Sequence, residues 1–412
     1  MSRRKLVAGL AVLGLALAIA ALAGVGTGAG TAAPHATQLS GTVSLFGWTT
    51  GTKEDDLLRE VLKGFEAKYP NVNVDYTAFG GDYDQTMLAK FSARQPPDVF
   101  YVNGHVFPVW VPQGVLASLT PYIKRSHFNT KQFYPRLLNG FKYKGQIYGF
   151  PKDWSPLAMY VNTDMLAKAG AKVPTTWAQL RSTAQKLKNA NAVPGGAPIC
   201  LSDDWARLFA FVYQNGYKGG IMSSRSMTTS AVRGAATFYT GLWKSGLAKR
   251  PPDLGASWNG EGFATGKCAI AFEGSWMLPT VKAASSIHYR AVPMPRNKTR
   301  GNLAFTVSYS MAKDAKHKAL GWTLLTYLTG RVGMRSWVSR GLGLPSRADV
   351  KPTAGSAVFT NAASYSRVWQ GGPKFNDVIT VANNELSAVA EGKESVSSML
   401  SKIQSAAKDA GQ

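Results

Sequence analysis

The sequence predicts an α/β fold, in which strands and helices alternate along the chain and helices cover the sheets. Two observations support this prediction. After Gly41, segments with the residue spacing of strands are separated by segments with the spacing of amphipathic helices. The chain also has 412 residues, which is more than one ordinary hydrophobic core accommodates. We therefore expect either two lobes or one large domain.

The first half of the chain contains the clearest alternation. A strand over 43–47 is followed by a helix that opens near Thr52 and is stopped by Pro70. A second strand over 72–76, a helix around 83–91 and an apolar strand over 99–102 come next. This order predicts the start of a parallel sheet with covering helices. Because open α/β sheets bind ligands at the carboxyl ends of their strands, the loops 48–51 and 103–105 are candidate site loops.

The rest of the chain continues the pattern with its own elements. The stretch 143–151 is hairpin-like. Asn162-Thr163 is a candidate cap of the helix that follows it, and Thr175 or Thr176 is a candidate cap of the next helix. Helices are expected at 205–213 and 231–243, and strands at 268–272 and 289–292. The segments 313–340 and 376–410 are expected to be largely helical.

Residues 1–36 have the features of a Sec-type export signal. Arg3, Arg4 and Lys5 precede an uncharged apolar run over 6–23 and a stretch of small residues over 24–33. The Arg3-Arg4 pair also fits the twin-arginine route, and the apolar run reaches the lower length limit of a membrane anchor. We expect a cleaved signal and a protein that acts outside the cytoplasm, with an uncleaved anchor as the alternative. No Cys lies near this stretch, so a Cys-linked lipid anchor is not expected.

The chain is strongly basic, with 47 Lys and Arg against 23 Asp and Glu and a formal net charge of +24. Nucleic-acid-binding proteins gather their cations on one face or in short runs with interleaved aromatic residues. Here the cations are spread out, and their longest cluster is a pair such as Lys124-Arg125. We therefore expect no nucleic-acid partner, and a surface protein that binds polyanions is an alternative supported by net charge alone.

Cysteine and histidine are scarce. Cys200 and Cys268 are the 2 cysteines, and in an oxidising compartment we expect them to form a disulfide, with two buried free thiols as the alternative. The 5 His residues show no HExxH or CxxC-type spacing, so we predict neither a metal site nor a cofactor. The sequence also lacks a P-loop and a dinucleotide-binding motif.

Nine short segments together resemble a known family. They are VSLFGWTTG, FEAKYPNVNVDY, PPDVFYVN, GVLASLTPYI, YKGQIYGFP, YVNTDMLAKAG, VPTTWAQL, FATGKCAIAFEGSW and GLGLPSR. Their order is similar to that of the family 1 extracellular solute-binding proteins, the maltose-binding-protein-like sugar-binding components of ATP-binding-cassette (ABC) importers. The resemblance implies a two-lobed periplasmic-binding-protein fold of type II, with a mainly parallel sheet and flanking helices in each lobe and a ligand cleft between them. The N-terminal lobe would comprise 41–152 plus 303–345, and the C-terminal lobe 153–302 plus 346–412.

The resemblance also implies which residues contact the ligand. They lie in breaks after strands or near the last helices: Trp48, Thr49, Thr50, Asn103, Asp153, Trp154, Ser155, Glu273, Ser275, Trp276, Arg347 and Trp369. A pyranose presents apolar C–H faces and a polar hydroxyl edge, so tryptophan planes and a few convergent polar groups suit it. An acidic contact of the maltose-binding protein appears here as Ser155, which argues against maltose as the ligand.

Several of these aromatic and charged residues have structural alternatives. Trp177 and Trp322 lie on apolar helical faces and are expected in the core, whereas Trp205, Trp243 and Trp337 fit either core or cleft. Asp98 is expected to hold a loop by hydrogen bonds. Glu273 has the alternative of capping the next helix, and Arg347 that of pairing with a carboxylate.

The expected function is capture of a mono- or oligosaccharide by a monomer, without catalysis, and its delivery to membrane permease subunits. A secreted enzyme of the glycoside hydrolase type is the alternative. It would need two carboxylates that face one glycosidic bond, such as Glu273 with Glu261 or with Asp153. Their separation does not follow from the sequence.

Overall fold

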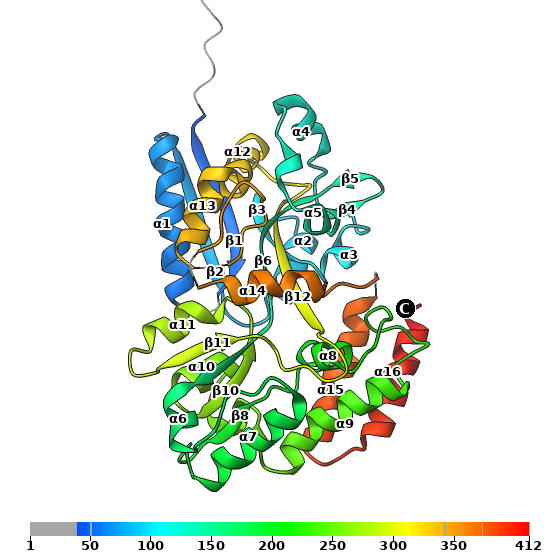
Figure 1. The fold of residues 1–412 in the computed structure, drawn as a ribbon. Coiled ribbons are helices and arrows are strands. Elements are labelled where there is room, and N and C mark those ends of the chain that lie inside the picture. Colours follow the sequence, from blue (N-terminus) through cyan, green and yellow to red (C-terminus); the bar gives the residue numbers. More distant parts are fainter. Residues whose placement is uncertain (1–38, 50–51, 342, 354, 373, 412) are drawn as a thin grey trace, which may run out of the picture. The chain divides into compact units, whose positions relative to one another are not determined.

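The computed structural model describes residues 39–49, 52–341, 343–353, 355–372 and 374–411 (Figure 1). The predicted export signal, residues 1–36, lies outside this part of the chain. Among the described helices, none is both long enough and apolar enough to cross a membrane.

The first sheet of the described chain has the strand order β13-β12-β3-β1-β2, and β6 also pairs with β12. β1 is parallel to β2 and β3, whereas β12 is antiparallel to β3 and β6 and parallel to β13. The strand bounds are β1 Gly41–Trp48, β2 Val72–Phe79, β3 Val99–Asn103, β6 Gly149–Pro156, β12 Asn302–Met311 and β13 Ser366–Val368.

Helices cover this sheet because their apolar residues recur at helical spacing. In α1 (Thr52–Lys68), Leu58, Val61, Leu62 and Phe65 form a buried stripe. The helix α2 (Tyr83–Ser92) begins at Asp82, whose side chain accepts a hydrogen bond from a backbone N–H of the first turn. α12 (Lys318–Thr329) and α13 (Arg331–Ser339) add further apolar residues to the same core.

Short elements extend this part of the molecule (Figure 1). They are α3 Phe107–Trp110, α4 Thr120–Ser126, η1 Thr130–Gln132, α5 Pro135–Asn139, β4 Lys142–Tyr143 and β5 Gln146–Ile147. β4 and β5 form an antiparallel pair, which confirms the hairpin-like stretch predicted there.

The second sheet has the order β11-β7-β10-β8-β9. β8 is parallel to β10 and β9, and β7 is antiparallel to β10 and β11. The bounds are β7 Ala158–Asn162, β8 Ala197–Cys200, β9 Ala248–Lys249, β10 Cys268–Glu273 and β11 Tyr289–Val292. The disulfide between Cys200 and Cys268, the pairing expected from the sequence, joins β8 to its neighbour β10 across a Cα–Cα distance of 5.6 Å.

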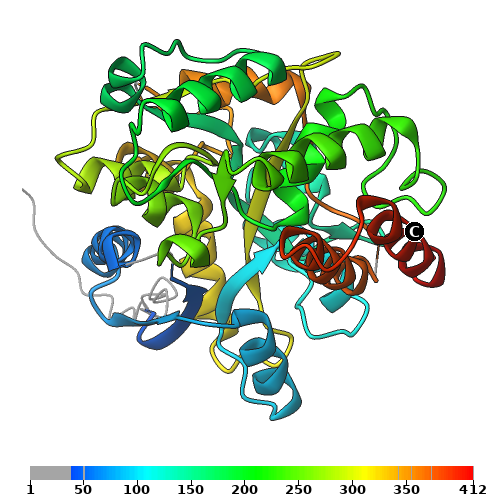
Figure 2. The same ribbon diagram turned by 90° about the horizontal axis from the view of Figure 1, so that it is seen from below.

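The helices of the second sheet begin at recognisable caps. The Asn162 side chain accepts hydrogen bonds from two backbone N–H groups at the start of α6, as the sequence predicts, and Thr176, one of the two predicted candidates, caps α7. α8, α9, α15 and α16 pack together, and the last two lie side by side in Figure 2. The bounds are α6 Thr163–Lys168, α7 Trp177–Asn189, α8 Trp205–Gln214, α9 Ser230–Lys244, η2 Pro252–Leu254, α10 Asn259–Ala264, α11 Met277–Ala283, α14 Ala357–Ala362, η3 Ala363–Tyr365, α15 Phe375–Ala390 and α16 Val396–Asp409.

The predicted α/β fold is therefore confirmed, although both large sheets are mixed rather than parallel throughout. The antiparallel pairs involve β6, β7 and β12, which lie where the chain passes from one sheet to the other. The predicted lobe bounds stay a prediction. The segment 346–412, assigned to the C-terminal lobe, includes β13, which pairs with β12 in the first sheet.

Candidate functional site

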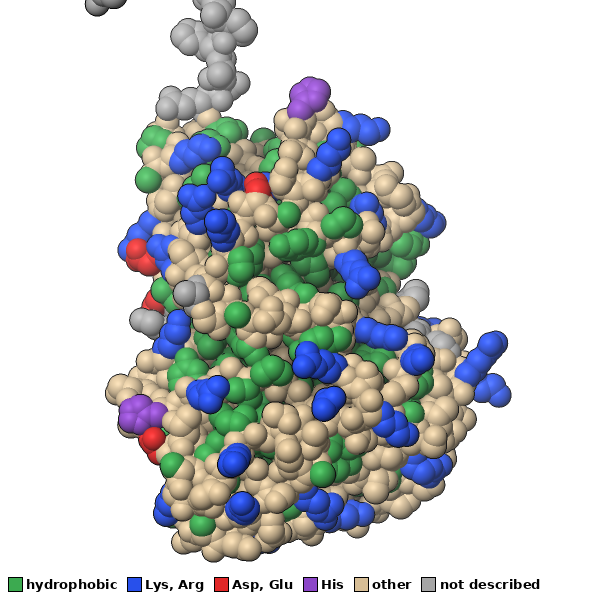
Figure 3. Space-filling model, in the orientation of Figure 1, with side chains coloured by type: hydrophobic (Ala, Val, Ile, Leu, Met, Phe, Trp, Pro, Cys, Tyr) green, Lys and Arg blue, Asp and Glu red, His purple; other side chains and the backbone are tan. Residues whose placement is uncertain are grey.

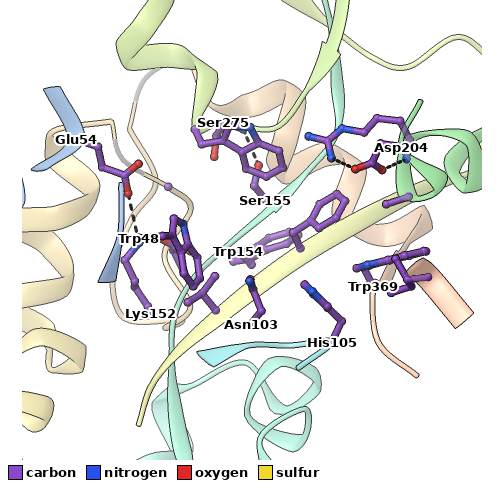
Figure 4. Close-up of a pocket in the computed structure, with 18 of the residues that line it drawn as sticks. Trp48, Glu54, Asn103, His105, Lys152, Trp154, Ser155, Asp204, Ser275 and Trp369 are labelled. Carbon is purple, nitrogen blue, oxygen red and sulfur yellow. Dashed lines mark hydrogen bonds and ion pairs between the residues drawn. The ribbon is translucent and has the colours of Figure 1, made fainter. Parts of the chain in front are cut away.

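A cavity of about 420 Å³ collects side chains from the elements of both sheets (Figure 4). Trp48 ends β1 and Asn103 ends β3, so the carboxyl ends of two parallel strands contribute to the cavity as the sequence analysis expects. Ser275 and Trp276 follow β10 of the second sheet. The volume lies within the roughly 300–1,000 Å³ that is usual for small-molecule sites.

The described lining residues include four tryptophans: Trp48, Trp154, Trp276 and Trp369. Each is held by neighbouring groups. The ring of Trp48 lies edge-to-face with those of Tyr83 and Tyr101, at centroid distances of 5.3 and 5.0 Å. The Trp154 indole N–H donates to the Pro345 carbonyl at 3.1 Å. Fixed aromatic rings of this kind form a rigid apolar wall.

Trp276 is fixed by a second ring and by a hydrogen bond. Its ring lies edge-to-face with Phe305 at 5.4 Å, and its indole N–H donates to Glu273 Oε2 at 2.9 Å. The Trp369 ring packs against Phe375 at 5.1 Å and lies 6.5 Å from Phe305. Phe305, which lies on β12, therefore links these two tryptophans.

One cation of the cavity, Lys152, is almost fully enclosed. Its Nζ lies 2.7 Å from Asp153 Oδ2 and 3.8 Å from Glu54 Oε1. It also lies over the rings of Trp337 and Tyr101, 3.8 and 5.0 Å from their centroids. Carboxylates and aromatic faces thus compensate a lysine whose exposed fraction is 5%.

The second cation, Arg207, is clamped in a similar way. Its NH1 lies 2.9 Å from Asp204 Oδ2, and its NH2 lies 2.7 Å from Glu273 Oε2. Burial opposes the charged form of Arg207, but Glu273 and Asp204 outweigh it and raise the pKa of the guanidinium above its usual range. Arg207 therefore stays charged while its guanidinium is shared between two carboxylates.

Some buried polar atoms beside the cavity lack a partner. The Ser275 backbone N–H donates to Ser155 Oγ at 2.6 Å, and Ser155 Oγ donates to the Pro156 carbonyl at 3.0 Å. Among the described residues, neither the Ser275 hydroxyl nor the Nε of Arg207 has a hydrogen-bond partner. Buried polar groups are normally satisfied, so these two atoms are exceptions within the described part of the chain.

His105 adds an uncharged polar ring to the floor of the cavity (Figure 4). Burial lowers the pKa of its imidazole to about 4, although Asp204 acts in the opposite direction. The ring is therefore neutral at pH 7 and offers both a donor and an acceptor nitrogen.

The structure brings most of the predicted ligand contacts to this one cavity. Eight of the twelve line it within the described part of the chain: Trp48, Asn103, Asp153, Trp154, Ser155, Ser275, Trp276 and Trp369. Glu273 is not a lining residue. It lies behind the wall, 1% exposed, and accepts hydrogen bonds from Arg207, Trp276 and Asn259.

Of the other three predicted contacts, Thr49 and Arg347 are not among the described lining residues. Thr49 donates its hydroxyl to Asp55 Oδ2 at 2.6 Å, and Thr50 lies outside the described residues. Arg347 pairs with Asp349 at 2.9 Å and lies over the ring of Phe133, which is the structural alternative weighed from the sequence. The ion pair with Asp349 thus accounts for the position of the Arg347 side chain.

Sequence reasoning missed several polar lining residues. They are Glu54, Lys152, Asp204, Arg207 and Asn383. His105, by contrast, belongs to the candidate site loop 103–105 and lines the cavity. The Asp204 side chain caps α8, because it accepts a hydrogen bond from the Arg207 backbone N–H. In the sequence, such a residue indicates the start of a helix and gives no indication of a ligand site.

No metal site is apparent in the described residues. Nowhere in that part of the chain do three or more His, Cys, Asp or Glu side chains gather in a way that could hold an ion.

Comparisons with known proteins identify relatives of this chain. The model of the family described as bacterial extracellular solute-binding protein matches residues 49–334, more than half of the chain. The diacetylchitobiose binding protein DasA of Streptomyces coelicolor is 24% identical over 306 residues, which are 71% of this chain and 70% of that relative.

Solved structures show the same fold. An ABC substrate-binding protein of Listeria monocytogenes in complex with cycloalternan superposes with a TM-score of 0.81 and 20% identity, over 90% of this chain and 98% of that one. The GacH receptor of Streptomyces glaucescens, studied unliganded and with acarbose, gives a TM-score of 0.78 and 21% identity over the same shares. These likenesses confirm the predicted two-lobed α/β fold.

Proposed function

Because the chain belongs to the bacterial extracellular solute-binding protein family, we propose that it captures a mono- or oligosaccharide and delivers it to the permease of an ABC importer. The names of its relatives support a ligand of the carbohydrate class, since they mention diacetylchitobiose, cycloalternan and acarbose. We propose that the protein acts as a monomer outside the cytoplasm after removal of residues 1–36, without a Cys-linked lipid anchor.

One observation carries this proposal: tryptophan planes and convergent polar groups line the same cavity. Sugars need this combination, because their ring faces are apolar while their edges carry hydroxyl groups. Trp48, Trp154, Trp276 and Trp369 would provide the planes. Asn103, His105 and the hydroxyl of Ser275 would serve the ring edge.

The proposed activity is binding without chemical conversion. A glycoside hydrolase needs a carboxylic acid that donates a proton to the leaving group. Glu273, the carboxylate common to both catalytic pairs considered from the sequence, accepts hydrogen bonds from Arg207, Trp276 and Asn259. It is engaged as a structural acceptor, which supports a binding role over a catalytic one.

Capture would involve closure of the two lobes about the segments that connect the sheets. The chain passes between the sheets from β6 to β7 and from β11 to β12. Ligand contacts from both lobes would favour the closed form, and that form would dock on the permease.

A titration tests the proposal directly. The protein without residues 1–36 would be titrated with a panel of mono- and oligosaccharides, polyols and glycerol phosphodiesters, with tryptophan fluorescence and thermal unfolding as readouts. We expect a saccharide to quench or blue-shift the fluorescence and to raise the unfolding temperature with increasing concentration. Chromatography of the incubated sugars provides the second arm. A flat response to every compound, or the release of shorter sugars, would contradict the proposal.

A further inference from the structure

The charges around the cavity oppose the charge of the chain as a whole. The chain carries a formal +24, and Lys and Arg side chains lie scattered over the face shown in Figure 3. From the net charge alone, an acidic sugar would be the expected ligand, because a basic surface attracts anions.

Inside the cavity, however, both described cations are already neutralised. Lys152 lies between Asp153 and Glu54 and beneath the ring of Trp337. Arg207 lies between Asp204 and Glu273. Counting these described side chains, four carboxylates and two cations leave the cluster with a formal charge of −2.

Most of these side chains are sheltered from solvent, so their charges act on a bound ligand more strongly than surface charges do. The side chain of Glu273 is 1% exposed, that of Lys152 5%, those of Asp153 and Glu54 14% and 15%, that of Arg207 18% and that of Asp204 34%. Charges on the outer surface are screened beyond about 8 Å at physiological ionic strength. The local carboxylates therefore decide which ligand charge the cavity accepts.

We infer that the cavity selects carbohydrates without a negative charge and discriminates against uronic acids and sugar phosphates, despite the basic character of the protein. The inference rests on the proposed function and narrows its ligand class. An acidic group in the cavity would find no uncompensated cation among the described lining residues. It would also experience repulsion from Asp153 and Asp204.

Matched sugar pairs test the inference on the wild-type protein. The probes are glucose with glucuronic acid and glucose 6-phosphate, maltose with maltose 6′-phosphate, and galactobiose with digalacturonic acid, each titrated by calorimetry. In every pair that binds, we expect the acidic member to bind at least about tenfold more weakly, since charges about 5 Å apart repel by more than 1.4 kcal/mol at a protein-like dielectric. An acidic member that binds as tightly as its neutral partner would overturn the inference and leave the proposed function standing. If no saccharide of this series or of the wider panel binds, the proposed function fails, and the inference fails with it.

A variant that removes one negative charge tests whether the cavity carboxylates cause the discrimination against acidic sugars. Asp204→Asn removes one cavity carboxylate and keeps an amide oxygen that can cap α8. The ratio of the Kd of the acidic sugar to the Kd of its neutral partner should fall by a factor of about three or more. The matched control is Asp203→Asn, because Asp203 pairs with Arg250 at 3.3 Å and does not line the cavity. An unchanged Kd ratio in Asp204→Asn, or an equal fall of the ratio in Asp203→Asn, would refute the electrostatic cause.

Discussion

Removal of the Trp276 side chain should separate the binding role of this residue from its packing role. Trp276→Ala deletes a ring that lines the cavity and lies 5.4 Å from Phe305. Loss of a stacking plane should weaken carbohydrate binding by about 1 to 3 kcal/mol. That range corresponds to a roughly 5- to 150-fold increase in Kd.

The same change also affects folding, and the structure gives the size of that effect. The edge-to-face pair with Phe305 contributes about 0.5–1.5 kcal/mol. The hydrogen bond to Glu273, 2.9 Å long, adds roughly 1.5–3 kcal/mol because its acceptor is charged. Urea unfolding without ligand should therefore show a loss of about 2 to 4.5 kcal/mol in the free energy of unfolding.

Trp276→Phe distinguishes the two roles, since it keeps an aromatic plane but loses the indole N–H. We expect a stability loss close to that of the hydrogen bond, with an affinity within about tenfold of wild type. Trp322→Phe is the control, because Trp322 stacks on Tyr122 at 5.4 Å and does not line the cavity. Wild-type affinity in Trp276→Ala, measured by calorimetry, would refute the stacking role.

Three further changes have expected outcomes. Replacing both Cys200 and Cys268 by Ala should lower the free energy of unfolding by about 4 kcal/mol, because the disulfide closes a loop with a sequence separation of 68. The pKa of His105 is lowered to about 4 by burial, so the unfolded chain binds more protons below pH 6.5. The contribution of His105 to the free energy of unfolding should thus fall as the pH drops from about 6.5 to 4, by up to about 3 kcal/mol, and the difference in stability between the wild type and His105→Gln should follow this dependence. Gly343→Ala would place a Cβ 2.8 Å from Asp153 Cβ, which should destabilise the fold by about 1–3 kcal/mol and weaken sugar binding.

Each of these changes has its own control. A reductant should reproduce the cysteine result in the wild-type protein and have no effect on the variant. His127→Gln, at the exposed end of α4, should leave the pH dependence as it is. Gly241→Ala adds a methyl group in open space on α9 and should not weaken binding. An unaltered slope of stability against pH in His105→Gln would contradict the burial argument, and unchanged binding in Gly343→Ala would place Asp153 outside the ligand contacts.

The sequence predicted those features whose physical cause is local. Helical spacing placed Trp177 and Trp322 in the core, and Trp177 indeed stacks on Phe238 at 4.4 Å while Trp322 packs against Tyr122. Asp98 holds a loop as expected, since it accepts hydrogen bonds from Ser44 and from the His317 backbone. The sequence also predicted that Trp48 and Asn103 lie at one cavity, because each ends a strand and parallel strands end at the same edge of a sheet.

The missed features depend on contacts between distant parts of the chain. Arg207 lines the cavity because Glu273, 66 residues further on, accepts its guanidinium N–H. Lys152 approaches Glu54 across a separation of nearly a hundred residues. A single sequence with many dispersed cations contains no signal for such pairs. By contrast, Arg347 pairs with Asp349 only two residues away, an arrangement that the local sequence already allowed.

Glu273 shows how one buried carboxylate can organise the wall of a cavity without lining it. Burial of a charge is unfavourable unless hydrogen bonds compensate it. Here Asn259 donates to Oε1 at 3.0 Å, while Arg207 and Trp276 donate to Oε2 at 2.7 and 2.9 Å. The latter two donors are a cation and an aromatic plane of the cavity wall, so the carboxylate determines the position of both. Because Arg207 compensates the charge of Glu273, its own positive charge is paired. This pairing helps to explain why a strongly basic chain has a cavity with no unpaired cation among its described lining residues.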